Sequence, residues 1–168
     1  MQRAKAVEGA VVTSTVANMM NREHMRAFFR RAAALVAFVA LLWAVHLLNW
    51  IIGYGLNPAF GLIPRHVSGL DGVIAMPLLH GSFAHLMANT PPLLVMGGLL
   101  VATTTRALLP VNAVVIGLGG GLVWLFGSSA IHIGASGLVF GWFGFLVARG
   151  FVDRSPITLG AALLVGVL

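Results

Sequence analysis

The 168-residue chain contains no cysteine and only four acidic residues. Without cysteine it can form neither a disulfide, a thiolate nucleophile nor a cysteine-based metal site, so any nucleophile has to be an oxygen. Charged residues make up 8% of the chain, whereas 59% of it is apolar and the mean hydropathy is +0.98. A soluble globule of this size needs more polar surface than these residues supply. We therefore expect an integral membrane protein.

Long stretches with few charges predict an all-α fold, a polytopic transmembrane helical bundle. About 20 apolar residues in a helix are enough to cross the apolar core of a bilayer. The predicted spans are residues 32–52, 78–101, 107–126 and the shorter 134–148. A fifth apolar run begins at Ile157 and is cut off by the chain end at Leu168, which makes it too short for a full crossing.

The basic residues are unevenly distributed along the chain. Residues 1–31 are predicted to form a basic, partly disordered tail, which holds six of the ten basic residues, and residues 32–168 the transmembrane domain. Alternating spans place nine of the ten on one side of the membrane and Arg65 alone on the other. This pattern predicts a cytoplasmic N-terminus and a contact with anionic lipid head groups. Membrane orientation accounts for the positive charge, so we expect no nucleic-acid partner.

Three polar residues, His80, His85 and Asn89, lie at the start of the second predicted span, where they are costly and indicate a functional site. His85 and Asn89 are four residues apart, so on a helix their side chains lie on one face. His80 precedes His85 by five residues and lies about 140° away around a regular helix. It is not expected to share their face.

Ser136 stands at the start of the short fourth span, within Gly134-Ala-Ser136-Gly137. A serine there is ordinarily a helix N-cap. A span this short has to begin below the membrane surface, and a helix start supplies free N–H groups and a positive dipole end for an oxyanion. Gly137 and Gly141 form a Gly-x-x-x-Gly face, which is expected to let the helix approach span 2.

These two motifs together resemble those of the rhomboid family of intramembrane serine proteases. The matching residues are His80-Gly-Ser-Phe-Ala-His85-Leu-Met-Ala-Asn89 in the second span and Gly134-Ala-Ser136-Gly137 in the fourth. The resemblance covers about residues 32–168. It implies a rhomboid-like bundle of six spans, of which about five are present.

The resemblance also implies roles for individual residues. Ser136 would be the nucleophile, and His85, Asn89 and the Ser136 backbone N–H would form the oxyanion hole. Three further residues would support this site, namely His80, Gly134 and Gly137. The segment 53–72 resembles the family's partly submerged first loop, with Arg65 as its anchor.

The chain departs from the family pattern at the catalytic histidine, which rhomboid proteases carry on a later span. No residue here matches it, and the sequence ends 32 residues after Ser136. A serine that lacks a general base loses about 10²–10⁴ in rate, so we expect the 168-residue chain to be weakly active or inactive. His132 is the nearby substitute, but a ring hydrogen-bonded to backbone is the expected state of a loop histidine. His46, one turn from Asn49, is expected to be a satisfied interhelical histidine.

The resemblance implies an intramembrane serine endopeptidase of the bacterial plasma membrane that acts on transmembrane protein substrates and uses no cofactor. The alternative is a catalytically inactive rhomboid-like protein that binds membrane clients without cleaving them. A metal site built from His80, His85 and His132 is disfavoured, because the spacing is not that of a zinc-binding helix and no glutamate accompanies it. Substrate identity and oligomeric state are left open.

Overall fold

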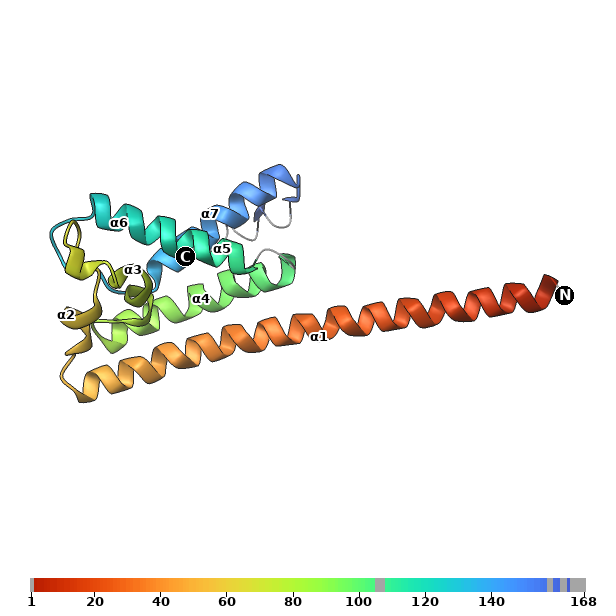
Figure 1. The fold of residues 1–168 in the computed structure, drawn as a ribbon, viewed down its shortest axis with the longest axis horizontal. Coiled ribbons are helices and arrows are strands. Elements are labelled where there is room, and N and C mark those ends of the chain that lie inside the picture. Colours follow the sequence, from red (N-terminus) through yellow and green to blue (C-terminus); the bar gives the residue numbers. More distant parts are fainter. Residues whose placement is uncertain (1, 105–107, 157–158, 161–162, 164–168) are drawn as a thin grey trace.

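The first helix, α1, is much longer than a membrane span. The structure is a computed structural model that describes residues 2–104, 108–156, 159–160 and 163. In it, α1 (Gln2–Ile51) is continuous and projects beyond the other helices at its N-terminal end (Figure 1). Residues 2–31, which were expected to form a partly disordered tail, are drawn as the first part of this helix. Residues 10–52 contain neither glycine nor proline, so nothing in the sequence breaks the helix where the basic tail meets the apolar span.

Among the residues that the structure describes, three helices are long and apolar enough to cross a membrane, namely Met19–Ile51, Phe83–Thr103 and Leu108–Phe126. The third is built from α5 (Leu108–Val114), the π-helical turn η3 (Val115–Gly119) and α6 (Gly120–Phe126). The shorter α7 (Ser136–Val152) corresponds to the predicted fourth span. The helical membrane bundle is thus confirmed. The turn at Arg106 and most of the fifth run, from Ile157, lie outside the described residues.

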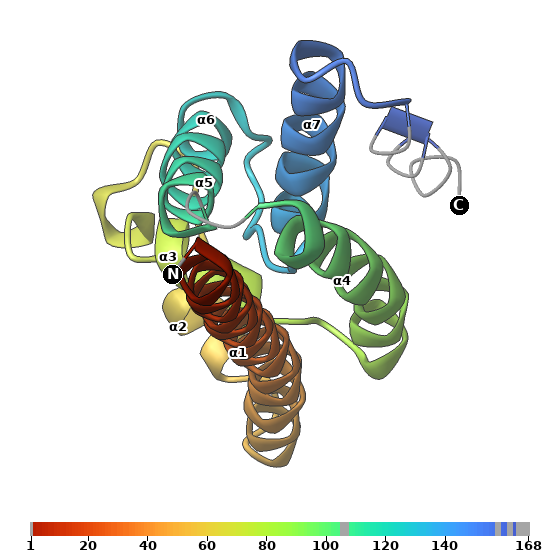
Figure 2. The same cartoon turned by 90° about the vertical axis from the view of Figure 1, so that its right-hand side faces the viewer.

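The helix α4 (Phe83–Thr103) lies between α1 and α7 (Figure 2). Gly97 allows this close packing, because a Cβ atom there would lie 3.0 Å from Leu35 Cδ2 and 3.2 Å from Trp142 Cζ3. The buried apolar core joins all three helices and α5: Leu42, Leu86, Leu93, Met96, Leu100, Val111, Leu138, Trp142 and Leu146. Burial of these side chains holds the starts of α4 and α7 in a fixed relation.

The glycine face of α7 packs differently from the prediction. A Cβ atom at Gly141 would overlap the side chain of Val115, in the π-helical turn of the third span. A Cβ atom at Gly137 would meet only Met76 Cε, at an ordinary 3.7 Å. The expectation that this Gly-x-x-x-Gly face brings α7 to span 2 is therefore wrong. Gly141 allows α7 to pack closely against the third span. The side chain of Trp142 packs against α4 at Gly97.

The segment between α1 and α4 covers one end of the bundle with short helical pieces (Figure 1). They are α2 (Leu56–Phe60), η1 (Val67–Gly69), α3 (Gly72–Ala75) and η2 (Met76–Leu78). Arg65 joins this segment to the loop that precedes α7. Its Nη1 donates to the carbonyls of Gly127 (2.8 Å) and Leu125 (3.3 Å), and its Nη2 to Ser129 Oγ (3.3 Å). Arg65 therefore ties two loops together at the end of the bundle where α4 and α7 begin.

Candidate functional site

The helix that carries His85 starts later than predicted. Ser82 is the N-cap of α4, and its Oγ accepts a hydrogen bond from the His85 backbone N–H at 3.1 Å. A serine directly before an apolar run is an N-cap signal that was available in the sequence. His80 consequently lies before the helix, outside regular secondary structure. Its ring lies 5.1 Å from that of His85, at 68°, so the expectation that these two residues face different directions is wrong.

His85 lies against the chain just before α7. A Cβ atom at Gly134 would fall 2.7 Å from His85 Nε2 and 2.8 Å from His85 Cε1, which only a glycine avoids. Gly134 also has a φ of +118°, a conformation that favours glycine. The imidazole of α4 is thus packed directly on the backbone two residues before Ser136.

The strand-like segment before Ser136 is fixed at two points. His132 and Leu62 exchange backbone hydrogen bonds of 2.8 and 3.0 Å, and the Gly134 N–H donates to the Met76 carbonyl at 2.8 Å. Ala135 follows and is completely buried. These contacts to the first loop were not predictable from motifs, because they depend on how that loop folds. They hold the start of α7 in place independently of its side chains.

Ser136 is the first residue of α7, and its side chain is exposed. Within α7, the first backbone donors with a carbonyl partner are the N–H groups of Leu138 and Val139, both of which donate to Ala135. The N–H groups of Ser136 and Gly137 precede them and have no acceptor within the helix. The site therefore combines an accessible hydroxyl with two backbone donors at the positive end of a helix dipole.

Asn89 lies one turn further along α4 than His85, as the spacing predicts. It is buried, and its Nδ2 donates to the His85 carbonyl at 2.9 Å. An amide nitrogen carries two N–H donors, so one is left for another acceptor. Within the described part of the chain no hydrogen bond joins the Ser136 hydroxyl to His85 or Asn89. The structure brings His85 to Gly134 and leaves Asn89 beneath it on the same helix.

His132 takes the backbone-bonded state expected of a loop histidine. Its Nε2 lies 3.1 Å from the Ser128 carbonyl, on the side of the loop that contacts Gly127. A ring engaged in this way is not directed at Ser136. Among the described residues, no imidazole hydrogen-bonds to the Ser136 hydroxyl.

His46 and His80 form a buried pair behind the site, with ring centroids 6.4 Å apart. The His46 ring hydrogen-bonds to no described residue, so the expectation of a satisfied His46 is wrong. Asn49, its expected neighbour, instead donates to Asn57 Oδ1 and accepts from the Leu56 N–H. Burial, followed by the nearby rings of His85 and His46, lowers the pKa of His80 to about 4. His80 is therefore neutral at physiological pH.

Comparison with known proteins identifies the family of the chain. A family model described as "Rhomboid domain" matches residues 67–167, which include the starts of both α4 and α7. The chain belongs to the rhomboid family. Family membership and the apolar helices together make it an integral membrane protein.

The similar curated proteins are mycobacterial. Uncharacterized proteins of Mycobacterium tuberculosis and Mycobacterium bovis are each 41% identical to this rhomboid over 138 residues, which cover 77% of this chain and 57% of theirs. A Mycobacterium leprae protein is 37% identical and is covered over 54% of its length. The chain thus spans a little over half the length of these relatives. No solved structure is significantly similar to it.

Proposed function

We propose that this rhomboid is an intramembrane serine endopeptidase whose nucleophile is Ser136. The observation that supports this most is the packing of the His85 ring on Gly134, two residues before Ser136. This contact joins the imidazole of α4 to the segment that leads into Ser136, whose side chain is exposed at the start of α7. Family membership supports the same activity.

The proposed reaction is acyl transfer to the serine oxygen. Ser136 Oγ attacks the carbonyl carbon of the scissile peptide bond, and the carbonyl oxygen becomes an oxyanion. His85, Asn89 and the Ser136 N–H stabilise that charge by donating hydrogen bonds. As the C–N bond breaks, the proton that the Ser136 hydroxyl gave up on attack passes to the leaving amine. Water then attacks the acyl-enzyme ester, which releases the carboxylic acid and restores the Ser136 hydroxyl.

The proposed substrates are transmembrane helices that unwind easily. A stable helix hides its carbonyls in its own hydrogen bonds, and in lipid each opened bond is costly. Substrates with small or helix-destabilising residues near the level of Ser136 should therefore be preferred. The N-terminus of the rhomboid is expected in the cytoplasm of a bacterial cell, which would put the site toward the outer face of the plasma membrane.

One observation favours a second candidate, a rhomboid-like protein that binds membrane clients without cleaving them. No imidazole in the described part of the chain hydrogen-bonds to Ser136, so no general base is assigned here. A binding protein of this kind would need the shape of the site without the reactivity of the serine.

A fluorophosphonate probe separates the two candidates, because it reacts with activated serines and needs no knowledge of the substrate. The gene product in native membranes is treated with the probe and the labelled peptide is mapped. We expect label on Ser136, loss of label in Ser136→Ala, and unchanged label in Ser128→Ala, a control serine in the exposed loop before α7. Absence of label, or label that persists in Ser136→Ala, would support the binding protein instead.

A further inference from the structure

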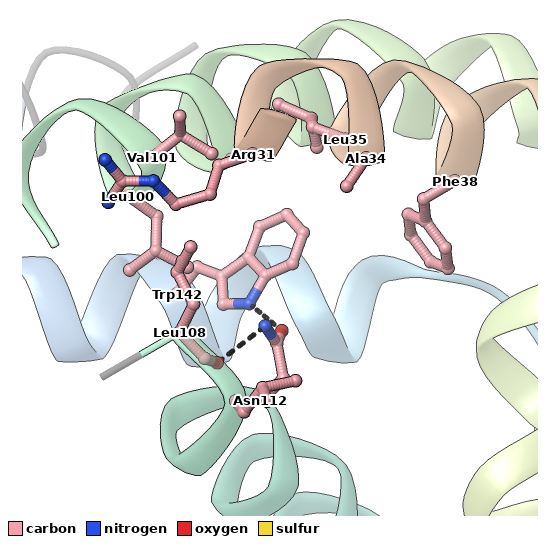
Figure 3. A pocket seen from close by; sticks show the side chains of 11 residues that line it. Arg31, Ala34, Leu35, Phe38, Leu100, Val101, Leu108, Asn112 and Trp142 are labelled. Atoms are coloured by element: carbon pink, nitrogen blue, oxygen red, sulfur yellow. Dashed lines mark hydrogen bonds between the residues drawn. The ribbon is translucent and has the colours of Figure 1, made fainter. Parts of the chain in front are cut away.

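An apolar pocket of about 330 Å³ lies away from Ser136, toward the other end of the bundle. It is lined by residues of α1, α4, α5 and α7, and Figure 3 shows their side chains. Among them are Leu35, Phe38, Leu100, Val101 and Trp142. Its volume is in the range of small-molecule and cofactor pockets, about 300–1,000 Å³.

The polar groups inside the pocket are occupied by one another. Trp142 Nε1 donates to Asn112 Oδ1 at 2.9 Å, and Asn112 Nδ2 donates to the Leu108 carbonyl at 2.8 Å (Figure 3). These bonds leave few free hydrogen-bonding groups in the interior for a polar ligand. The part of a ligand that enters the pocket therefore has to be apolar.

Positive charge gathers at the rim of the pocket. Arg31 lines it and donates from Nη1 to the Thr104 carbonyl at 2.9 Å and from Nε to the Ala27 carbonyl at 3.0 Å. Arg149 donates to Thr104 Oγ1 at 2.6 Å, so two guanidinium groups converge on one residue. Arg149 is paired with Asp153, but no carboxylate pairs with Arg31 in the part of the chain that the structure describes. A guanidinium has five N–H donors, and these two bonds leave donors free for an anion.

We propose that this pocket binds one anionic phospholipid, with an acyl chain between α1, α4 and α7 and the phosphate on Arg31. An apolar interior beneath an unneutralised arginine matches the two parts of such a molecule, and anionic lipids attract basic segments next to a span. Another membrane protein fits less well, because its inner end would also carry an excess of Lys and Arg. A second copy of this chain, with a net charge of +6, would bring the same repulsion.

Native mass spectrometry of the purified gene product tests the site. The detergent-solubilised protein is titrated with phosphatidylglycerol or phosphatidylcholine, and bound lipid is counted. We expect one phosphatidylglycerol to be retained about tenfold more tightly than phosphatidylcholine, as one charge-assisted contact would give. Equal retention of the two lipids would overturn the proposal.

Two variants with matched controls locate the binding. Arg31→Gln removes the phosphate partner, and Ala34→Phe fills the pocket from an exposed position on α1 without touching a hydrogen bond. Each should weaken phosphatidylglycerol binding about tenfold. Arg22→Gln and Ala33→Phe change exposed positions of α1 outside the pocket and should leave binding unchanged.

The proposal would be contradicted if either variant bound phosphatidylglycerol as tightly as its control. It would also be contradicted if the protein were a dimer that Ala34→Phe dissociates, because a second chain would then occupy the pocket. Ser136→Ala should retain the lipid in full. Failure of this proposal is thus distinguishable from failure of the proposed protease function.

Discussion

The imidazole of His85 occupies the space that a side chain at position 134 would need. A Cβ atom on Gly134 would lie 2.7 Å from His85 Nε2, and the φ of +118° at Gly134 opposes any side chain there. This contact joins the start of α4 to the segment that leads into α7. It therefore links the two motifs that carry the candidate site.

Gly134→Ala should therefore damage both the fold and the site. The new methyl group has to displace the His85 ring or shift the backbone before Ser136, at a cost of about 1–3 kcal/mol in the free energy of unfolding. Unfolding in mixed micelles measures the stability, and fluorophosphonate labelling measures the site. Gly98→Ala is the control, because nothing lies within 4 Å of its Cβ position in α4. If Gly134→Ala and Gly98→Ala have the same stability and the same labelling, the contact between His85 and Gly134 does not stabilise the fold or the site.

Asn89→Ala tests the proposed oxyanion donor. Removing one such donor typically slows the chemical step by about 10²–10³, so the rate of fluorophosphonate labelling at Ser136 should fall by that order. Thr90→Ala is the matched control on the next residue of α4. Within the described ranges the Thr90 hydroxyl bonds only to the Leu86 carbonyl and the Trp43 indole, and its loss should leave the labelling rate unchanged. Equal labelling rates for the two variants would show that Asn89 is not an oxyanion donor.

Arg65→Ala should loosen the loop before α7. Its guanidinium donates to two carbonyls and one hydroxyl of residues 125–129. These bonds hold the loop before α7 against the segment between α1 and α4. Hydrogen exchange of the His132 amide should become roughly tenfold faster, the equivalent of about one net hydrogen bond. Arg65→Lys, which keeps the charge but not the forked geometry, should give an intermediate rate. An exchange rate that does not change in Arg65→Ala would mean that the backbone bridge alone fixes the loop.

The buried neutral state of His80 predicts acid sensitivity. Its pKa is lowered from 6.5 to about 4 in the folded protein, so between these values the unfolded chain binds a proton that the folded chain does not. Stability should be highest above pH 6.5 and fall as the pH drops toward 4. His80→Phe should flatten this part of the profile, whereas His24→Gln, on the exposed side of α1, should not. A profile that His80→Phe leaves unchanged would assign the effect to another group.

Much of the architecture was accessible from the sequence. The apolar runs predicted the spans, and the four-residue spacing placed His85 and Asn89 together on α4. The position of Ser136 at a helix start also followed, because the glycines before it end one element and an apolar run begins another.

The errors share one physical cause, which is dependence on tertiary contacts. His80 was assigned to a regular helix, but Ser82 caps α4 after it, and this brings its ring to His85. Gly141 was predicted to contact span 2, but it packs against Val115. Val115 lies in a π-helical turn that no local sequence pattern predicts. His46 was expected to find a hydrogen-bond partner, but Asn49 is bound to Asn57 and Leu56 instead.

The most direct test of the site is a structure of the gene product with a phosphonate covalently bound to Ser136 Oγ, because the phosphoryl oxygen stands in for the oxyanion of the tetrahedral intermediate. The measurement is the distance from that oxygen to the side-chain nitrogens of His85 and Asn89 and to the Ser136 N–H. We predict hydrogen-bond distances of about 2.7–3.1 Å to the Ser136 N–H and to at least one of the two side chains. A phosphoryl oxygen that faces away from α4, beyond reach of both His85 and Asn89, would contradict the proposed catalytic site.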